Sequence, residues 1–323
     1  MTTEFVIDLE EIARLPSPEG FSLVSIQIRY DGVLLALFVR DPGVEAVTET
    51  VASSIGIFPQ TRTQEAHAYK LYRIDAESCT CTDLPALDIT FPMVDVFPDG
   101  HIILAGARSS WRAPDDVDLN GAIVSPSGEL VRRILLGDGI QHLAVDRLGR
   151  IWVGYFDEGI CGNFGWGGPG PDPVGASGLV CFAPDGSRLW EFPFASEPEV
   201  IDDCYAMNVF GDSAYFYFYS DFSLCHAASD HTLQYWQTGL SGCSELAVLN
   251  DWAMFNGQYD DPPNTIYSLT LATGAAPRAR KGVLRLPDGD RSAEIGWIGR
   301  GDSLNVVKDG VWCSARLRDL RER

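Results

Sequence analysis

The sequence is poor in positive charge. Its 323 residues include 24 lysines and arginines against 45 aspartates and glutamates, which gives a formal net charge of -21. A surface of this sign repels nucleic-acid phosphates and anionic lipid headgroups. We therefore expect neither nucleic acid nor membrane as a partner, whereas cations, basic peptides and metal ions would be attracted.

Long apolar runs are also missing. No segment approaches the roughly 18 apolar residues that a membrane helix requires. Residues 1–5 lack the basic region and the apolar run of a secretory signal. A cytoplasmic location is therefore expected. In a reducing compartment, the eight cysteines should be free thiols that pack as small apolar groups.

The sequence lacks several well-known catalytic signatures. It has no Gly-x-Ser-x-Gly elbow, no phosphate loop, no dinucleotide fingerprint and no His-Glu-x-x-His pair. Hydrophobic residues make up 46% of the chain and charged residues 21%, which is the composition of a folded globular protein. The sequence therefore predicts a folded protein, but it contains none of these motifs that would identify a reaction.

One stretch, residues 139–192, sets the pattern for the rest of the chain. Tight turns at Leu148-Gly149 and Asp185-Gly186 join its strands in pairs, because glycine supplies the positive φ that hairpin turns need. Four short antiparallel strands of this kind form one blade of a β-propeller. We expect these four strands at residues 142–146, 150–155, 179–183 and 188–192.

The same pattern recurs, and the expected strands fall into six groups. The groups cover residues 23–84, 91–136, 142–192, 205–238, 245–280 and 294–317. The last group lacks a fourth strand, whereas residues 4–10 form a strand without a nearby partner. The sequence thus predicts an all-β fold, a six-bladed β-propeller in a single domain over residues 1–323. The N-terminal strand joins the C-terminal blade and closes the ring, which leaves no unpaired edge.

The segment 145–154, Val-Asp-Arg-Leu-Gly-Arg-Ile-Trp-Val-Gly, resembles the repeat of NHL-like propellers. Streptogramin B lyases and the SMP-30/gluconolactonase group share such repeats, and the Pro-Asp-Gly turns at 98–100 and 184–186 look similar. The resemblance implies a divalent metal in the central channel. For the lyases it implies a histidine and a glutamate over that metal, so His142 with Glu245 or Glu294 is the pair it points to. The paired asparagine motifs of the lactonases are not visible in this sequence.

Propeller geometry indicates where a ligand would bind. The starts of the innermost strands and the loops between second and third strands open onto one face, and long loops on a rigid scaffold often carry binding sites. The opposite face should present mostly Asp-Gly and Ser-Gly turns. The ligand-binding residues predicted on the loop face are Gln141, Asp157, Glu158, Asn163, Trp166, Asp203, Tyr205 and Glu294.

Carboxylates dominate the predicted face. Oxygens from Asp203, Glu245 and Glu294 would suit a hard cation such as Ca²⁺ or Mg²⁺, or else line a water-filled channel. His142 and Glu245 are the predicted catalytic pair, because imidazole titrates near neutral pH. Residues 116–121 match the start of a calcium loop, but Ser127 stands where a bidentate glutamate is required, so a solvated acidic loop is favoured.

Two classes of function remain. The first is a binding module whose acidic channel mouth holds a small molecule, a basic peptide or a partner protein. The second is a metal-dependent hydrolase, lactonase or lyase that uses the channel carboxylates and His142. The first is preferred because no catalytic signature is present. The sequence does not decide whether any reaction is catalysed.

Overall fold

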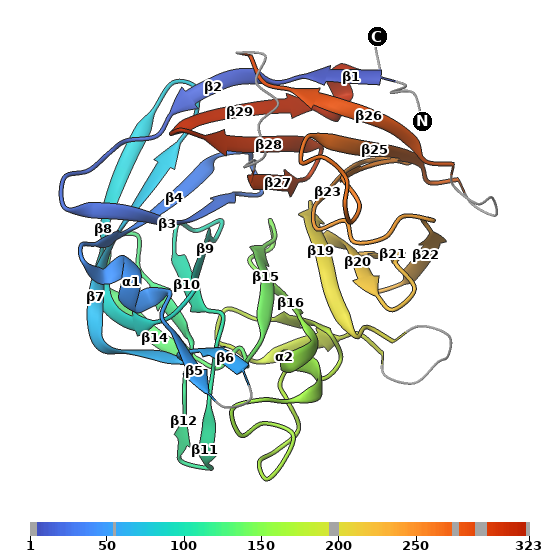
Figure 1. The fold of residues 1–323 in the computed structure, drawn as a ribbon. Helices are drawn as coiled ribbons and strands as arrows, with labels where there is room; N and C mark the ends of the chain where they lie inside the picture. Colours follow the sequence, from blue (N-terminus) through green and yellow to red (C-terminus); the bar gives the residue numbers. More distant parts are fainter. Residues whose placement is uncertain (1–4, 54–55, 194–199, 273–277, 288–295, 321–323) are drawn as a thin grey trace. The chain divides into compact units, whose positions relative to one another are not determined.

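The strands of the computed structural model confirm the predicted fold class. The structure describes residues 5–53, 56–193, 200–272, 278–287 and 296–320. In this part of the chain, six large sheets of four or five strands account for the architecture, and the fold is a six-bladed β-propeller (Figure 1). None of the described helices is long and apolar enough to cross a lipid bilayer.

The chain divides into two compact units. We call residues 16–29 and 33–203 the middle unit, and residues 1–15, 30–32 and 204–323 the terminal unit. Each unit is described by itself below.

The middle unit contains three four-stranded sheets. In each of them, neighbouring strands follow one another in chain order. The first consists of β3 (Phe21–Ile28), β4 (Leu34–Arg40), β7 (Arg62–Ile74) and β8 (Cys79–Ile89). The second consists of β9 (Pro92–Val96), β10 (Ile102–Gly106), β13 (Gly121–Val124) and β14 (Leu130–Ile134). The third consists of β15 (Ile140–Val145), β16 (Ile151–Tyr155), β17 (Leu179–Phe182) and β18 (Arg188–Glu191).

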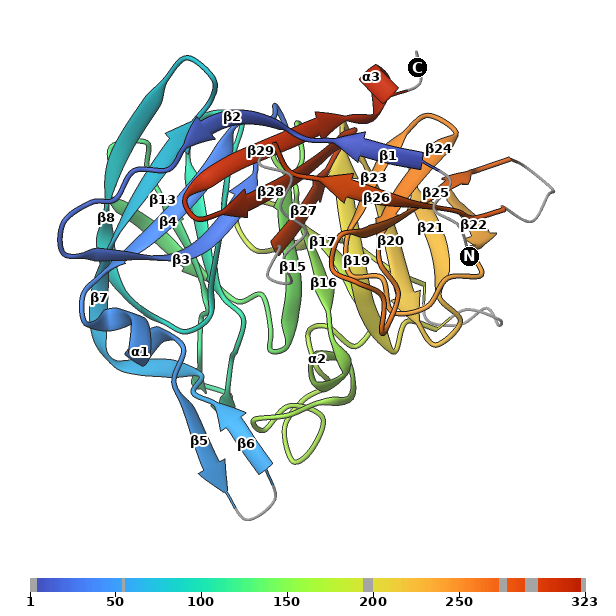
Figure 2. The same ribbon diagram turned by 45° about the horizontal axis from the view of Figure 1, so that its top comes forward.

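Smaller elements fill the connections of the middle unit. They are α1 (Gly43–Val47), β5 (Thr50–Ser53), β6 (Gly56–Pro59), β11 (Trp111–Ala113), β12 (Asp116–Val117) and α2 (Asp157–Cys161). Figure 2 shows the β5–β6 hairpin extending away from α1. Helix α2 directly follows β16 and opens the long glycine-rich insertion of the third sheet.

A buried aspartate explains the repeat motif of the third sheet. Asp146 is fully buried, and its Oδ1 accepts hydrogen bonds from the backbone N–H groups of Leu148 and Arg150, both at 2.9 Å. Its Oδ2 accepts from Arg150 Nε at 2.6 Å and from Trp152 Nε1 at 3.1 Å. The Asp-x-x-Gly-Arg-x-Trp pattern therefore encodes a tight turn and the position of the tryptophan, and each donor offsets the cost of burying the carboxylate.

The terminal unit contains the other three sheets. The first consists of β19 (Asp203–Phe210), which begins at the boundary between the units, β20 (Ser213–Tyr219), β21 (Ser223–Ala227) and β22 (Leu233–Gln237). The second consists of β23 (Leu246–Leu249), β24 (Trp252–Asn256), β25 (Thr265–Thr270), β26 (Arg280–Arg285) and β1 (Phe5–Asp8). The third consists of β27 (Gly296–Arg300), β28 (Ser303–Lys308), β29 (Val311–Arg316) and β2 (Glu10–Arg14), and α3 (Leu317–Leu320) follows β29.

Closure by the N-terminus is confirmed, but the strand that provides it differs from the prediction. The sequence assigned residues 4–10 to the last sheet. In the structure, β2 pairs antiparallel with β29 and completes that sheet, whereas β1 pairs parallel with β26 in the preceding one (Figure 1). The N-terminal segment therefore joins two sheets of the terminal unit. Leu9 lies between its two short strands, and the Leu9 N–H donates a hydrogen bond to the Arg285 carbonyl at 2.9 Å.

A buried asparagine links the three sheets of the terminal unit. Asn208 Nδ2 donates to the carbonyls of Leu246 and Gly301, both at 2.9 Å. Its Oδ1 accepts from the Gly301 N–H at 2.8 Å. A single side chain on β19 thus forms hydrogen bonds with backbone groups of the two other sheets of the terminal unit.

Candidate functional site

Arg108 anchors the long insertion that begins with α2. Its side chain is buried, and Nη2 contacts Asp138 Oδ2 at 2.9 Å and Glu158 Oε2 at 2.5 Å. The guanidinium carbon lies 4.7 Å from the ring centre of Phe164 and 5.2 Å from that of Phe156. Two aromatic faces and two carboxylates therefore surround one cation. Glu158, predicted as a ligand contact, is engaged in this arrangement.

Two further predicted contacts lie in the same insertion. Trp166 is 5% exposed and its Nε1 donates to the Ser109 carbonyl at 3.0 Å, so the indole packs in the core of the middle unit. Asn163 accepts the Phe164 N–H through its own Oδ1 at 2.8 Å. Both side chains shape the insertion. A direct contact between either of them and a ligand stays a prediction.

The charge of one predicted acidic residue, Asp157, acts on another, Asp203. Asp157 is exposed at the first residue of α2, and Asp203 is partly buried at the start of β19. Burial, and then the negative charge of Asp157, raise the pKa of Asp203 to about 6. Gln141 is exposed and His142 partly exposed on β15, where the pairing with β16 is irregular. These residues remain candidates for a polar site in the middle unit.

Glu245 belongs to the terminal unit. Glu245 precedes β23, and its Oε2 accepts the Gly299 N–H at 3.0 Å. Burial raises the pKa of Glu245 to about 8. Glu294 lies outside the described residues. Within those residues, no three or more His, Cys, Asp or Glu side chains are grouped so that they could hold a metal ion.

Several acidic residues of the long loops already have cationic partners. Arg112 contacts both Asp116 and Asp118, with Nη2 at 2.8 Å and 2.6 Å from their Oδ1 atoms. Arg62 Nε also lies 3.0 Å from Asp118. The calcium-loop residues therefore have their charge balanced by guanidinium groups of the same unit.

The terminal unit presents a group of four aromatic residues that the sequence analysis identified only in part. Tyr205, Tyr219, Phe222 and Tyr259 form what we call the aromatic cluster. The Tyr205 ring centre lies 5.4 Å from Phe222 and 6.2 Å from Tyr259, with the planes near perpendicular at 85° and 87°. The hydroxyls of Tyr205 and Tyr259 are hydrogen bonded to each other. Tyr219 is 46% exposed and Tyr259 53%, so large parts of two rings face solvent.

The backbone holds the aromatic cluster in place. Phe222 adopts φ of 54°, a conformation that bulky residues rarely take. Its ring stacks on buried Tyr217 at 5.5 Å. Tyr259 lies against Gly242, where an added Cβ would sit 2.5 Å from the ring. Two exposed carboxylates flank the rings in sequence, Asp221 before Phe222 and Asp260 after Tyr259.

Sequence reasoning found one of these four residues directly. Tyr205 was predicted because it lies at an inner-strand start, and Phe222 and Tyr259 lie in loops expected on the same face. The signal that would have found them is an aromatic residue next to an aspartate in each loop, Asp221-Phe222 and Tyr259-Asp260.

Comparisons with known proteins agree with the fold. No family model matches the sequence, and no curated protein matches it. The structure is similar to virginiamycin B lyase from Staphylococcus aureus, with a TM-score of 0.50 and 11% identity over 95% of this chain and 97% of that one. A streptogramin B lyase matches with a TM-score of 0.49 and 12% identity over 95% and 96%. A gluconolactonase from Xanthomonas campestris matches with 0.42 and 11% over 94% and 99%. At these identities the likeness shows the fold alone, a propeller of the type that the sequence repeats resemble.

Proposed function

We propose that this protein is a binding module whose aromatic cluster takes a cationic ligand, the ammonium group of a basic peptide. The observation that carries the proposal is the exposure of Tyr219 and Tyr259 beside Tyr205 and Phe222. The negative face of an aromatic ring attracts a cation placed over it, and groups of such rings select ammonium groups over neutral ones.

The flanking carboxylates support the same ligand. Asp221 and Asp260 have no side-chain hydrogen-bond or ion-pair partner within the described residues. Neighbouring Asp261 differs, because its Oδ1 lies 2.6 Å from Lys281 Nζ and Tyr267 donates to its Oδ2. Two carboxylates without a partner next to exposed tyrosines favour a positively charged ligand. The net charge of -21 would also speed its approach.

The cluster is built in advance of any ligand. Holding Phe222 at φ of 54° and Asp260 at 63° costs on the order of 1–3 kcal/mol each. Such strain persists where the surroundings fix it, and it is frequent at binding sites. Rigid rings would lose little further freedom on binding, which favours affinity.

The proposed setting is the cytoplasm. All eight cysteines are free thiols, three exposed and five buried. Free thiols suit a reducing compartment, where a basic peptide or protein would be the partner.

The test uses a fluorescent peptide rich in lysine and the same peptide with its lysines acetylated. Fluorescence anisotropy should show binding of the charged peptide and at least tenfold weaker binding of the acetylated one. Tyr259→Leu should weaken binding of the charged peptide by about 1 kcal/mol, roughly fivefold. Tyr235→Leu, which changes an exposed tyrosine on β22, is the matched control and should bind normally. Equal affinity for both peptides, or no effect of Tyr259→Leu, would count against the proposal.

A metal-dependent hydrolase, lactonase or lyase is the second candidate. It is favoured by Glu245, whose pKa of about 8 lets the carboxyl serve as an acid near neutral pH. The test is turnover of simple lactones with added Ca²⁺ or Mg²⁺, compared with EDTA. Loss of turnover in Glu245→Gln would support it. No turnover and no change of melting temperature with either ion would rule against it.

A further inference from the structure

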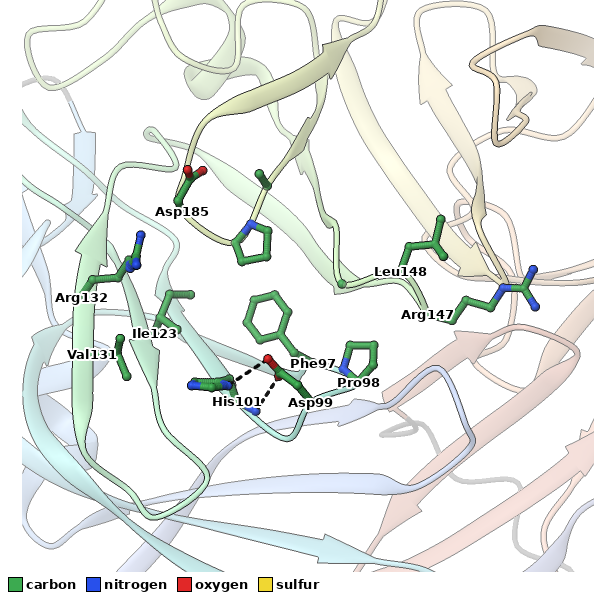
Figure 3. Close-up of a pocket in the computed structure, with 13 residues that line it drawn as sticks. Phe97, Pro98, Asp99, His101, Ile123, Val131, Arg132, Arg147, Leu148 and Asp185 are labelled. Carbon is green, nitrogen blue, oxygen red and sulfur yellow. Dashed lines mark hydrogen bonds and ion pairs between the residues drawn. The ribbon is translucent and has the colours of Figure 1, made fainter.

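A cavity of about 490 Å³ lies between the second and third sheets of the middle unit. Tight turns between strands line it, and the sequence predicts such turns on the face opposite the expected ligand site. Figure 3 shows its walls, which come from the β9–β10 turn, the β15–β16 turn, the β17–β18 turn and strands β13 and β14. Pockets for small organic ligands typically have volumes of about 300–1,000 Å³.

The floor and two edges of this cavity are apolar. Phe97 and Ile123 form buried surface, with 3% and 5% of their area exposed. Val131 and Leu148 line the cavity and are 48% and 61% exposed. An apolar ligand that covers these exposed side chains would remove their surface from water, which favours binding.

Two aspartates, Asp99 and Asp185, and two arginines, Arg132 and Arg147, line the cavity. Asp99 is used locally, since it accepts the His101 N–H at 3.0 Å and its Oδ2 lies 3.1 Å from His101 Nδ1. Asp185 is also used locally, because the Ser187 N–H and hydroxyl donate to its Oδ1 at 2.9 Å and 2.6 Å. Arg132 has no hydrogen bond or ion pair with any residue that the structure describes. The Arg132 guanidinium therefore lines the cavity without a directly bonded anionic partner.

We propose that this cavity binds a small organic anion, a monocarboxylate with an aryl or alkyl body. The body would cover Phe97, Ile123 and Leu148, and the carboxylate would pair with Arg132. Arginine binds carboxylates through two parallel N–H groups, which fixes the ligand's direction. Because Asp185 lies near Arg132, a ligand with more negative charges would be disfavoured. This site lies in the middle unit and does not depend on the aromatic cluster of the terminal unit.

Phenylbutyrate and its neutral analogue phenylbutanol are the probes, and isothermal titration calorimetry is the measurement. Phenylbutyrate should bind more tightly than phenylbutanol. Arg132→Gln should weaken phenylbutyrate about tenfold, equivalent to about 1.4 kcal/mol, and leave phenylbutanol unchanged. Leu148→Asp should abolish binding of both, because it places a charge against the apolar body. Both residues are exposed, so neither change should affect folding.

Two matched controls lie on β18 of the third sheet and outside the cavity. Arg188→Gln removes the same charge, and Leu189→Asp replaces a leucine of similar exposure, 50%. Both should bind phenylbutyrate as the unchanged protein does. The proposal is overturned if phenylbutyrate does not bind, if phenylbutanol binds equally well, or if Arg188→Gln weakens binding as much as Arg132→Gln. An unchanged affinity in Leu148→Asp would also overturn it, because the ligand would then lie elsewhere.

Discussion

Glu245 Oε2 accepts a hydrogen bond from the Gly299 N–H at 3.0 Å, which joins the start of β23 to β27. Burial raises the pKa of this carboxyl from 4.5 to about 8. The protonated form is therefore the one that the folded protein favours at neutral pH. A glutamine would keep the oxygen acceptor and would carry no charge.

Glu245→Gln should accordingly change how stability depends on pH. Since the folded pKa is raised, the favourable contribution of Glu245 is fully present below pH 4.5 and is lost as pH rises through about 8. Urea unfolding should give similar stability for both proteins at pH 4.5. At pH 9 the variant should be more stable by on the order of 3 kcal/mol. Each pH unit by which the pKa of Glu245 is raised is equivalent to about 1.4 kcal/mol. Partial exposure of the residue makes the expected difference smaller than that conversion gives. Parallel stability curves for the two proteins would refute this prediction.

Gly242→Ala should disturb the aromatic cluster without removing any aromatic ring. Gly242 has φ of 76°, and a Cβ there would meet the Tyr259 ring at 2.5 Å. Gly239 is the matched control, because its φ is 66° and no other atom lies within 4 Å of the place that an added Cβ would take. Both alanine variants should lose about 1 kcal/mol of stability from the strained backbone. Binding of the lysine-rich peptide should fall in Gly242→Ala alone, and equal affinities in the two variants would mean that Tyr259 does not need this position.

The fold could largely be predicted from the sequence because its strands are marked locally. Turn glycines separate many of the strands, and runs of apolar residues mark the strands themselves. Apart from the N-terminal residues, the described strands follow the expected order. What the sequence could not decide was the partner of each N-terminal residue. Residues 5–14 contain two short apolar patterns around Leu9, and either could add to an open sheet edge. The choice depends on long-range packing of Ile7 and Leu9, which local patterns do not reveal.

The candidate site was less predictable, for a different reason. Carboxylates were chosen by residue type and loop position, but their partners come from distant parts of the chain. Glu158 is paired with Arg108, fifty residues earlier, and no spacing rule announces this. Tyr205 could be predicted because the sequence pattern locates the start of each innermost strand. The rings around it depend on the conformation of Phe222, whose positive φ no propensity would suggest.

Ile7→Ala tests the role of the N-terminal strands. Ile7 is 2% exposed and packs with Leu284 and other residues of the terminal unit's core. Truncating a buried isoleucine costs about 2–5 kcal/mol. Val6→Ala, on the opposite side of β1 with 50% exposure, should change stability by less than about 0.5 kcal/mol. Urea denaturation of both variants provides the measurement. Equal, small effects would show that β1 adds little to the terminal unit.

Arg108→Met should destabilise the middle unit because it leaves Asp138 buried without its cation. Breaking a buried ion pair on one side costs about 3–5 kcal/mol. Burial already raises the pKa of Asp138 from 3.8 to about 6, despite the attraction of Arg108. Its favourable contribution is thus present below pH 3.8 and lost as pH rises through about 6. Without Arg108 the pKa should rise further, so the loss of stability should be larger at pH 8 than at pH 5.

The double variant Arg108→Met with Asp138→Asn separates lost charge pairing from lost packing. Asparagine keeps an oxygen for the Ser109 N–H, which donates to Asp138 Oδ1 at 2.8 Å, and carries no charge. If the buried charge causes the loss, the double variant should recover most of the stability at pH 8 and little at pH 5. Arg188→Met, at an exposed pair with Glu191, should cost less than about 1 kcal/mol at either pH. A loss in Arg108→Met that is independent of pH, and that the second substitution does not relieve, would mean that the guanidinium acts through its packing between Phe156 and Phe164.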